Sequence, residues 1–312
     1  MKIKAVLLSL IIAGGLALSG CTASENNDNN DNNDNGGNNS ANTSDSTLKD
    51  GIQTFPDEDA LNGLKTADAR AERIGVAALG GSDNTLIGWG LGHDRDGIGR
   101  PIDALKAQEK YGGRSALFID DSESKNIYLT FDEGYENGYT GAILDTLKKA
   151  GVKATFFVTY DYCVSAPDLV ERMIAEGHTV GNHSYSHPSF PSCSEAEVTE
   201  EVKILHDYVK DNFGYEMTLF RFPKGEFSDR TLSQLESMGY TSVFWSFAYQ
   251  DWNADKQPSA AEAFDIITSS THSGGIYLLH AVSKANSDAL GDVIDYWKSN
   301  GFTIGDINGL TD

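Results

Sequence analysis

Basic side chains are scarce in this chain of 312 residues. Lysine and arginine together number 24 against 46 aspartates and glutamates, which gives a formal net charge of −22. Because a nucleic-acid backbone is bound chiefly by cationic side chains, this balance argues against nucleic acid as a partner. The Gly-rich stretch 87–101 lacks a GxGxxG fingerprint after a strand, which excludes a dinucleotide site there. Its DRDG segment lacks the later ligands of a calcium loop.

The N-terminus has an apolar run that is too short for a comfortable membrane span. Lys2 and Lys4 begin the chain's basic start, the apolar run covers 5–17, and Leu-Ser-Gly precedes Cys21. Small residues before a cysteine resemble the lipobox of bacterial lipoproteins, in which the cysteine is acylated. We therefore expect residues 1–20 to be a signal peptide, and we expect a lipid anchor that holds the protein to the membrane outside the cytoplasm. The alternative is an ordinary signal peptide with a chance cysteine.

Residues 21–50 are expected to form a disordered tether. Asparagine and aspartate dominate residues 25–36, and such a composition cannot bury a core. Two cysteines remain after Cys21, at Cys163 and Cys193. Outside the cytoplasm we expect them to form a disulfide, and two free buried thiols are the alternative.

From residue 126 onward, strand-like and helical patterns alternate. The strand-like runs are 126–131, 154–159, 178–182, 218–222, 241–247, 276–280 and 302–306. Repeated βα units imply an α/β fold with parallel strands buried on both faces, and seven such strands predict a closed or nearly closed barrel. We expect this domain to cover 126–312, with residues 51–125 as an N-terminal extension packed on it. In barrels of this kind the chemistry lies at the carboxyl ends of the strands.

Polar side chains gather at those strand ends. They are Asp132 and Glu133 after the first run, His183 and His187 after the third, Arg221 in the fourth, Asp251 and Trp252 after the fifth, and His280 at the end of the sixth. His-x-x-x-His on a helical turn would place the rings of His183 and His187 on one face, as zinc ligands require. A divalent metal there would acidify a water and polarise a carbonyl oxygen. The pattern therefore predicts a metal-assisted hydrolase.

Five motifs together resemble those of the polysaccharide deacetylases, carbohydrate esterase family 4. They are Thr130–Gly134, His183–His187, Arg221–Gly225, Asp251–Trp252 and Leu278–His280. The family fold is a distorted (β/α) barrel, which agrees with the strand count. Longer strings, such as VFWSFAYQDW and YLLHAVSKAN, resemble the branch that deacetylates N-acetylmuramic acid in peptidoglycan, including the enzymes that prepare muramic δ-lactam.

The resemblance implies roles for four of these side chains in amide hydrolysis. Asp132 matches the general base that activates the attacking water, and Arg221 matches the residue that holds this base ionised. His280 matches the general acid that protonates the leaving amine, and Asp251 matches its orienting partner. Such a protein would release acetate from an acetamido group.

The resemblance also implies a metal site. His183 and His187 match metal ligands, and we expect zinc, or alternatively cobalt or manganese. The family's second Asp is Glu133 here, and the first Asp of the later Asp-x-x-Asp-Trp motif is Ala248. Because a carboxylate is kept beside two histidines, we expect Glu133 to be the third ligand. The alternative is that Glu133 points away and that His183, His187 and water bind the metal alone.

Three further residues match the walls of the family's site. Trp252 and Leu278 match walls of the acetyl pocket, and the backbone N–H of Lys224 matches an oxyanion donor. The expected partners are peptidoglycan glycan strands and the membrane, with the protein acting as a monomer.

Rival functions remain open at this point. An enzyme acting on N-acetylglucosamine, chitin or acetylated xylan would share the fold and the chemistry. A solute-binding lipoprotein would share the signal and the tether, although the retained Asp132, His183, His187 and His280 argue against it. A catalytically dead wall-binding relative is the third alternative, because Glu133 departs from the family pattern.

Overall fold

A computed structural model of the protein describes residues 83–311. The expected signal peptide, Cys21, the expected tether and residues 51–82 of the expected extension lie outside the described residues. Within residues 83–311, no helix has both the length and the apolar character that crossing a membrane requires.

The centre of the fold is a sheet of eight strands, and all its pairings are parallel. The strands are β2 (Ala116–Leu117), β3 (Asn126–Glu133), β4 (Thr155–Val158), β5 (Thr179–Asn182), β6 (Leu219–Phe220), β8 (Thr241–Val243), β9 (Gly275–His280) and β10 (Thr303–Ile304). The seven strands predicted from the alternating pattern are all present. The eighth, β2, comes from the weakly patterned region before residue 126 and was not predicted.

The sheet curls into the expected distorted barrel. Its strand order is β10-β3-β4-β5-β6-β8-β2, and β9 also pairs with β3. Beyond β8, a parallel bridge joins Phe247 to Tyr277 of β9, and Leu278 donates its N–H to the Phe247 carbonyl at 2.9 Å. The strands from β9 through β3, β4, β5, β6 and β8 therefore return to β9 and enclose an interior.

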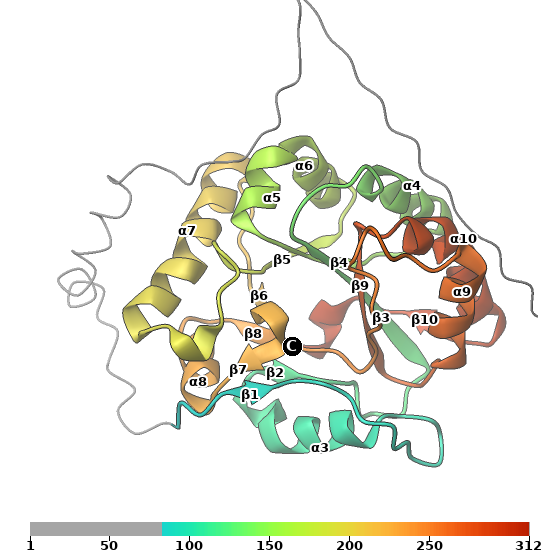
Figure 1. Ribbon diagram of the computed structural model, residues 1–312, viewed down its shortest axis with the longest axis horizontal. Coiled ribbons are helices and arrows are strands. Elements are labelled where there is room, and N and C mark those ends of the chain that lie inside the picture. The colour runs from blue at the N-terminus through green and yellow to red at the C-terminus, as the bar shows by residue number, and fades with distance from the viewer. Residues whose placement is uncertain (1–82, 312) are drawn as a thin grey trace, which may run out of the picture. The chain divides into compact units, whose positions relative to one another are not determined.

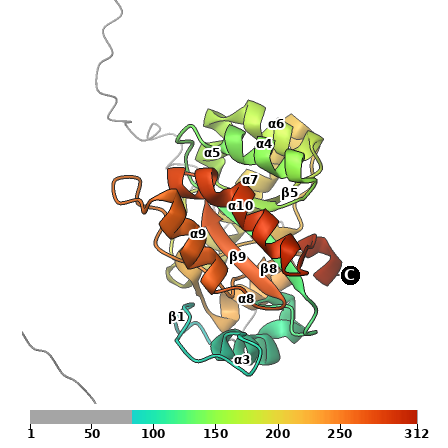
Figure 2. The ribbon, with the colours of Figure 1, turned by 90° about the vertical axis from the view of Figure 1, so that its right-hand side faces the viewer.

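Helices lie around the outside of these strands (Figure 1). They are α3 (Ile102–Tyr111), α4 (Thr140–Ala150), α5 (Tyr160–Ser165), α6 (Pro167–Ala175), α7 (Glu195–Phe213), α8 (Asp229–Ser237), α9 (Ala260–Ser269) and α10 (Lys284–Ser299). Ser194 and Glu197 form a capping box at the start of α7, and Gly151 ends α4 with φ 67°. Figure 2 shows α9 and α10 side by side over β9.

Short elements complete the described chain. They are the antiparallel pair β1 (Ile87–Gly88) and β7 (Glu226–Phe227), and the 3-10 turns η1 (Gly112–Arg114), η2 (Phe190–Ser192), η3 (Pro223–Gly225) and η4 (Ile307–Leu310). Through β1 and β2, residues before 126 contact the sheet and the chain that follows β6.

Alternation along the strands separates an inner layer from an outer one. The inner apolar cluster consists of Tyr128, Phe157, Leu219, Val243, Ile276 and Ile307. The outer cluster, packed under the helices, takes the intervening positions, such as Leu129 and Phe131 of β3. Gly181 of β5 faces inward, where a Cβ would lie 2.4 Å from the Phe157 ring, so only glycine fits there. Every second strand residue, counted from a member of the inner cluster, therefore points into the barrel.

The expected disulfide is wrong, because Cys163 and Cys193 are both free thiols. Cys163 is buried in α5, near enough to Tyr208 of α7 for its charge to add, after burial, to the raised pKa of that tyrosine. Cys193 lies just before the first turn of α7, whereas Tyr208 lies near its other end. At 1.5 Å per residue these positions are about 20 Å apart along the helix, far beyond the roughly 7 Å Cα separation that a disulfide allows.

Candidate active site

A fully buried arginine holds together the polar part of the barrel interior. Arg221 follows β6, and its Nη1 donates to Asp132 Oδ1 and to Thr130 Oγ1, each at 2.8 Å. Its Nε and Nη2 donate to the carbonyl oxygens of Val243 and Phe244 at 3.0 and 3.1 Å. All three guanidinium nitrogens therefore donate hydrogen bonds, and the carboxylate of Asp132 is fixed in place.

Asp132 is an ionised carboxylate despite its burial. Burial alone would raise the pKa of Asp132, but the charge of Arg221, with smaller contributions from His183 and His280, outweighs it and lowers this pKa. The second oxygen of Asp132, Oδ2, lies 3.6 Å from His183 Nε2. One oxygen is thus held by Arg221, and the other faces the histidines.

His280 lies directly opposite Asp132 in the ladder between β9 and β3. Its Nδ1 lies 2.7 Å from Asp251 Oδ1, and its backbone N–H donates to Asp251 Oδ2 at 2.8 Å. Burial would lower the pKa of His280, but the hydrogen bond and charge of the fully buried Asp251 outweigh it and raise this pKa. Because Nδ1 is engaged, Nε2 is the nitrogen left to exchange a proton with a bound molecule.

Sequence reasoning missed Asn286, which supports this pair. Asn286 is buried in α10, and its Nδ2 donates to Asp251 Oδ2 at 2.6 Å and to the His280 carbonyl oxygen at 3.2 Å. The hydroxyl of Tyr249 donates to Asn286 Oδ1. The available signal was an asparagine on the apolar face of a helix that begins just after a site strand, because such an amide needs buried partners.

His183 and His187 come together as predicted, but on a loop and not on a helical turn. His187 has φ 58°, its N–H donates to Ser184 Oγ at 2.9 Å, and the two imidazole centroids are 4.9 Å apart. His183 Nδ1 lies 2.8 Å from the Arg221 carbonyl oxygen, so Nδ1 carries the proton and Nε2 keeps its lone pair. Burial lowers the pKa of both rings, that of His187 to about 4. Two adjacent neutral imidazoles fit a divalent metal as donors.

Glu133 does not join the two histidines, which corrects the expectation that it is the third ligand. In the part of the chain that the structure describes, no three His, Cys, Asp or Glu side chains are grouped to hold a metal ion. The reason is strand alternation: Asp132 points inward, and the next residue of β3 points outward. Glu133 is fully buried near Tyr162 and Glu136, and among residues 83–311 neither of its carboxylate oxygens has a hydrogen-bond partner. Burial, followed by the charges of Glu136 and Asp132, raises the pKa of Glu133 well above its ordinary value.

The three predicted wall residues come from three different segments of the chain. Trp252 is 52% exposed, with its ring centroid 5.8 Å from that of His280. Leu278 lies two residues before His280 on the same face of β9. Lys224 lies in η3 with φ 60°, and its charge is among the influences that lower the pKa of His187.

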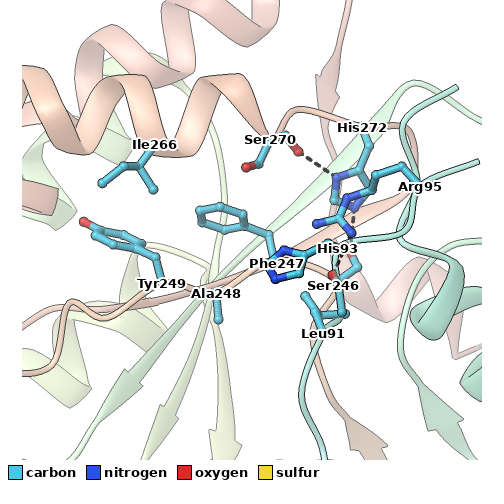
Figure 3. A pocket seen from close by; sticks show the side chains of 11 residues that line it. Leu91, His93, Arg95, Ser246, Phe247, Ala248, Tyr249, Ile266, Ser270 and His272 are labelled. Atoms are coloured by element: carbon cyan, nitrogen blue, oxygen red, sulfur yellow. Dashed lines mark hydrogen bonds between the residues drawn. The ribbon is translucent and has the colours of Figure 1, made fainter.

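A separate pocket of about 220 Å³ lies on the flank of the barrel, between the chain after β8, the loop of residues 91–95, and α9 (Figure 3). Its wall includes Phe247 and Tyr249, which face Ile266 of α9. His272 is buried here between the Ser246 hydroxyl and the Ser270 carbonyl. These two contacts engage both ring nitrogens of His272.

Comparison of the sequence with known proteins indicates a family. A family model described as polysaccharide deacetylase matches residues 120–243. The peptidoglycan-N-acetylmuramic acid deacetylase PdaA of Bacillus subtilis (strain 168) is 38% identical over 241 residues, which cover 76% of this chain and 90% of PdaA. The chain belongs to the polysaccharide deacetylase family. An uncharacterized 30.6 kDa protein of Geobacillus stearothermophilus is 46% identical to this chain over 232 residues, which cover 73% of this chain and 86% of that protein.

The fold of the deacetylase also has a solved counterpart. The structure of Bacillus subtilis PdaA, described as a family 4 carbohydrate esterase, superposes with a TM-score of 0.70 at 37% identity and covers 73% of this chain and 97% of that one. The family and the barrel fold predicted from the five motifs are therefore confirmed.

Proposed function

We propose that this deacetylase hydrolyses the acetamido group of N-acetylmuramic acid residues in peptidoglycan glycan strands and releases acetate. The similarity to PdaA over nearly the whole length of that enzyme supports the choice of sugar. The observation that carries the proposal is the pair Asp132 and His280, an ionised carboxylate and an imidazole of raised pKa on adjacent strands in direct register.

In this proposal the two groups act on opposite sides of one carbonyl. Asp132 accepts the proton of the attacking water through Oδ2, the oxygen that Arg221 leaves free. His280 donates a proton from Nε2 to the leaving nitrogen while Asp251 holds Nδ1. The raised pKa of His280 favours the protonated imidazole, which a general acid requires.

The neighbouring residues bind and orient the acetamido group. The backbone N–H of Lys224 is assigned to the carbonyl oxygen, where negative charge develops in the transition state. Trp252 and Leu278 are assigned to the walls of the acetyl pocket, because one lies beside the His280 ring and the other shares its strand face.

His183 and His187 would hold a divalent metal, zinc or alternatively cobalt or manganese. When bound, such a metal lowers the pKa of a water molecule and polarises the carbonyl group. The Nδ1–H of His183, bonded to the Arg221 carbonyl, orients this ring toward Asp132.

The N-terminus is assigned to a lipid anchor. We infer that Cys21 is acylated and that residues 21–50 tether a monomeric deacetylase to the outer side of a bacterial membrane, where peptidoglycan lies. Cys21→Ser should release the protein from the membrane fraction or block its processing. A Cys21→Ser protein that still fractionates with the membrane as an acylated chain would refute this assignment.

The proposed reaction is tested on purified peptidoglycan by mass spectrometry of the released sugars and by acetate assay. We expect acetyl loss from muramic sugars, lowered by about 10²-fold or more in Asp132→Asn and in His280→Ala. N-acetylglucosamine oligomers, chitin and acetylated xylan serve as parallel substrates, and preferential turnover of one of them would replace the proposed sugar. Binding to wall material without acetate release would favour a non-catalytic wall protein.

A further inference from the structure

The N-terminal extension reaches the turn that carries Lys224. β1 pairs with β7, with Ile87 opposite Phe227 and Gly88 opposite Glu226 (Figure 1). β7 begins directly after the turn η3. The extension therefore holds the chain where it leaves the turn.

Trp89, the first residue after β1, contacts both the turn η3 and the chain after β8. Its backbone N–H donates to the Gly225 carbonyl at 2.9 Å, and its indole Nε1–H donates to the Trp245 carbonyl at 3.0 Å. Its ring packs edge-on against Phe118, with centroids 4.7 Å apart, which anchors it in the core. One residue thus ties the turn after β6 to the chain after β8.

The turn has little freedom between these contacts. A Cβ on Gly225 would lie 2.7 Å from Trp245 Cη2 and 3.2 Å from Trp89 Cβ, and Gly225 has φ 67°. The glycine is therefore clamped between two tryptophans. Lys224 has φ 60°, a conformation that a lysine keeps only where the surrounding structure enforces it.

We propose that Trp89 is a positioning residue for the reaction: by clamping Gly225 against Trp245, it fixes the direction of the Lys224 backbone N–H. The inference rests on the proposed function, which assigns this N–H to the developing oxyanion. A donor that acts on charge present only in the transition state affects turnover more than substrate binding. Loss of the clamp should therefore lower kcat and leave KM nearly unchanged.

Trp89→Phe tests this, because it removes the indole donor that holds the Trp245 carbonyl, and with it the support of the second wall of the clamp, while it keeps an aromatic ring and the backbone N–H. We expect kcat to fall by about 10-fold with KM within about two-fold of wild type. Gly88→Ala is the matched control, because a methyl group there would meet nothing within 4 Å, and we expect it to change neither constant. Gly225→Ala should lower kcat further than Trp89→Phe. Thermal unfolding of each variant checks that it folds.

A second measurement follows the turn without relying on activity. Hydrogen exchange of residues 224–227 should accelerate by about 10-fold in Trp89→Phe and stay unchanged in Gly88→Ala. Unchanged exchange together with wild-type kcat in Trp89→Phe would overturn the inference, as would a rise in KM with kcat preserved. A wild-type protein that releases no acetate from any substrate would count against the proposed function instead, and the exchange rates would still decide whether Trp89 holds the turn.

Discussion

Replacing Arg221 by methionine should expose how strongly the fold depends on one buried charge pair. Arg221 is fully buried, and its Nη1 lies 2.8 Å from Asp132 Oδ1. Its guanidinium also lies 4.2 Å from the centroid of the Phe157 ring. Methionine roughly preserves the apolar stem but removes every donor. Asp132 would then remain in the barrel interior without the charge that compensates its own.

The expected cost is large because one partner of a buried pair is left behind. Breaking such a pair typically costs about 3–5 kcal/mol of unfolding free energy. In the wild type the lowered pKa of Asp132 makes its ionisation stabilising, and this contribution is lost as pH falls through the lowered pKa. Without Arg221, burial is the largest remaining influence and should raise the pKa of Asp132 above its ordinary value of about 3.9. The variant should therefore gain stability as pH falls from neutral toward that value, opposite in sign to the wild-type contribution.

Urea unfolding at several pH values, in the presence of a chelator, measures both effects. The double variant Arg221→Met with Asp132→Asn is the control, because it removes both charges and should recover much of the loss. If the two single losses simply add in the double variant, or if Arg221→Met loses stability on acidification, then the pair does not stabilise the fold in the way argued.

Two further predictions concern the residues that support His280 and the residues expected to bind the metal. Asp251→Asn should lower the pKa of His280, because Asp251 is the largest influence that raises it. The basic limb of the rate profile should then move to lower pH, and kcat should fall by about 10²-fold. Asp255→Asn, at an exposed position, should change neither. An unmoved basic limb would show that another group protonates the leaving amine. Glu133→Gln should leave divalent-metal affinity, measured by calorimetry, within about two-fold of wild type, whereas His183→Ala should weaken it by more than about 10-fold. Equal weakening by the two variants would show that Glu133 turns inward when metal binds.

The positions of the site residues along the chain could be predicted because strand ends are visible in the sequence. The seven apolar runs became strands of one parallel sheet, so the polar residues after them meet at one end of the barrel. Asp132 and His280 illustrate this, since they are almost 150 positions apart and yet pair in direct register. No spacing rule identified Asn286 or Trp89, because their roles depend on which buried amide or indole meets which carbonyl after packing.

The errors arose where a local pattern was read without its backbone conformation. His-x-x-x-His suggested a helical turn, but the chain after β5 forms a loop in which Ser184 and His187 both have positive φ. The histidines still meet because Ser184 Oγ accepts the His187 N–H. The pairing of Cys163 with Cys193 failed for a different reason, since a cysteine count contains no information about where the fold places each cysteine.

The inward and outward alternation of β3 separates the roles of two neighbouring acids. Tyr128, Thr130 and Asp132 face the interior. Toward the carboxyl end of the strand, Tyr128 packs in the inner apolar cluster, Thr130 accepts a hydrogen bond from Arg221, and Asp132 lies opposite His280. An acid at the position of Asp132 meets a guanidinium and is ionised, whereas one position later Glu133 meets no cation in the described structure and has a raised pKa. Two carboxylates adjacent in sequence therefore have pKa values shifted in opposite directions, because a strand places them in different layers. By the same alternation, an acid placed one residue before or after position 132 would point out of the barrel and could not act as the proposed base, although the composition of the chain would be unchanged.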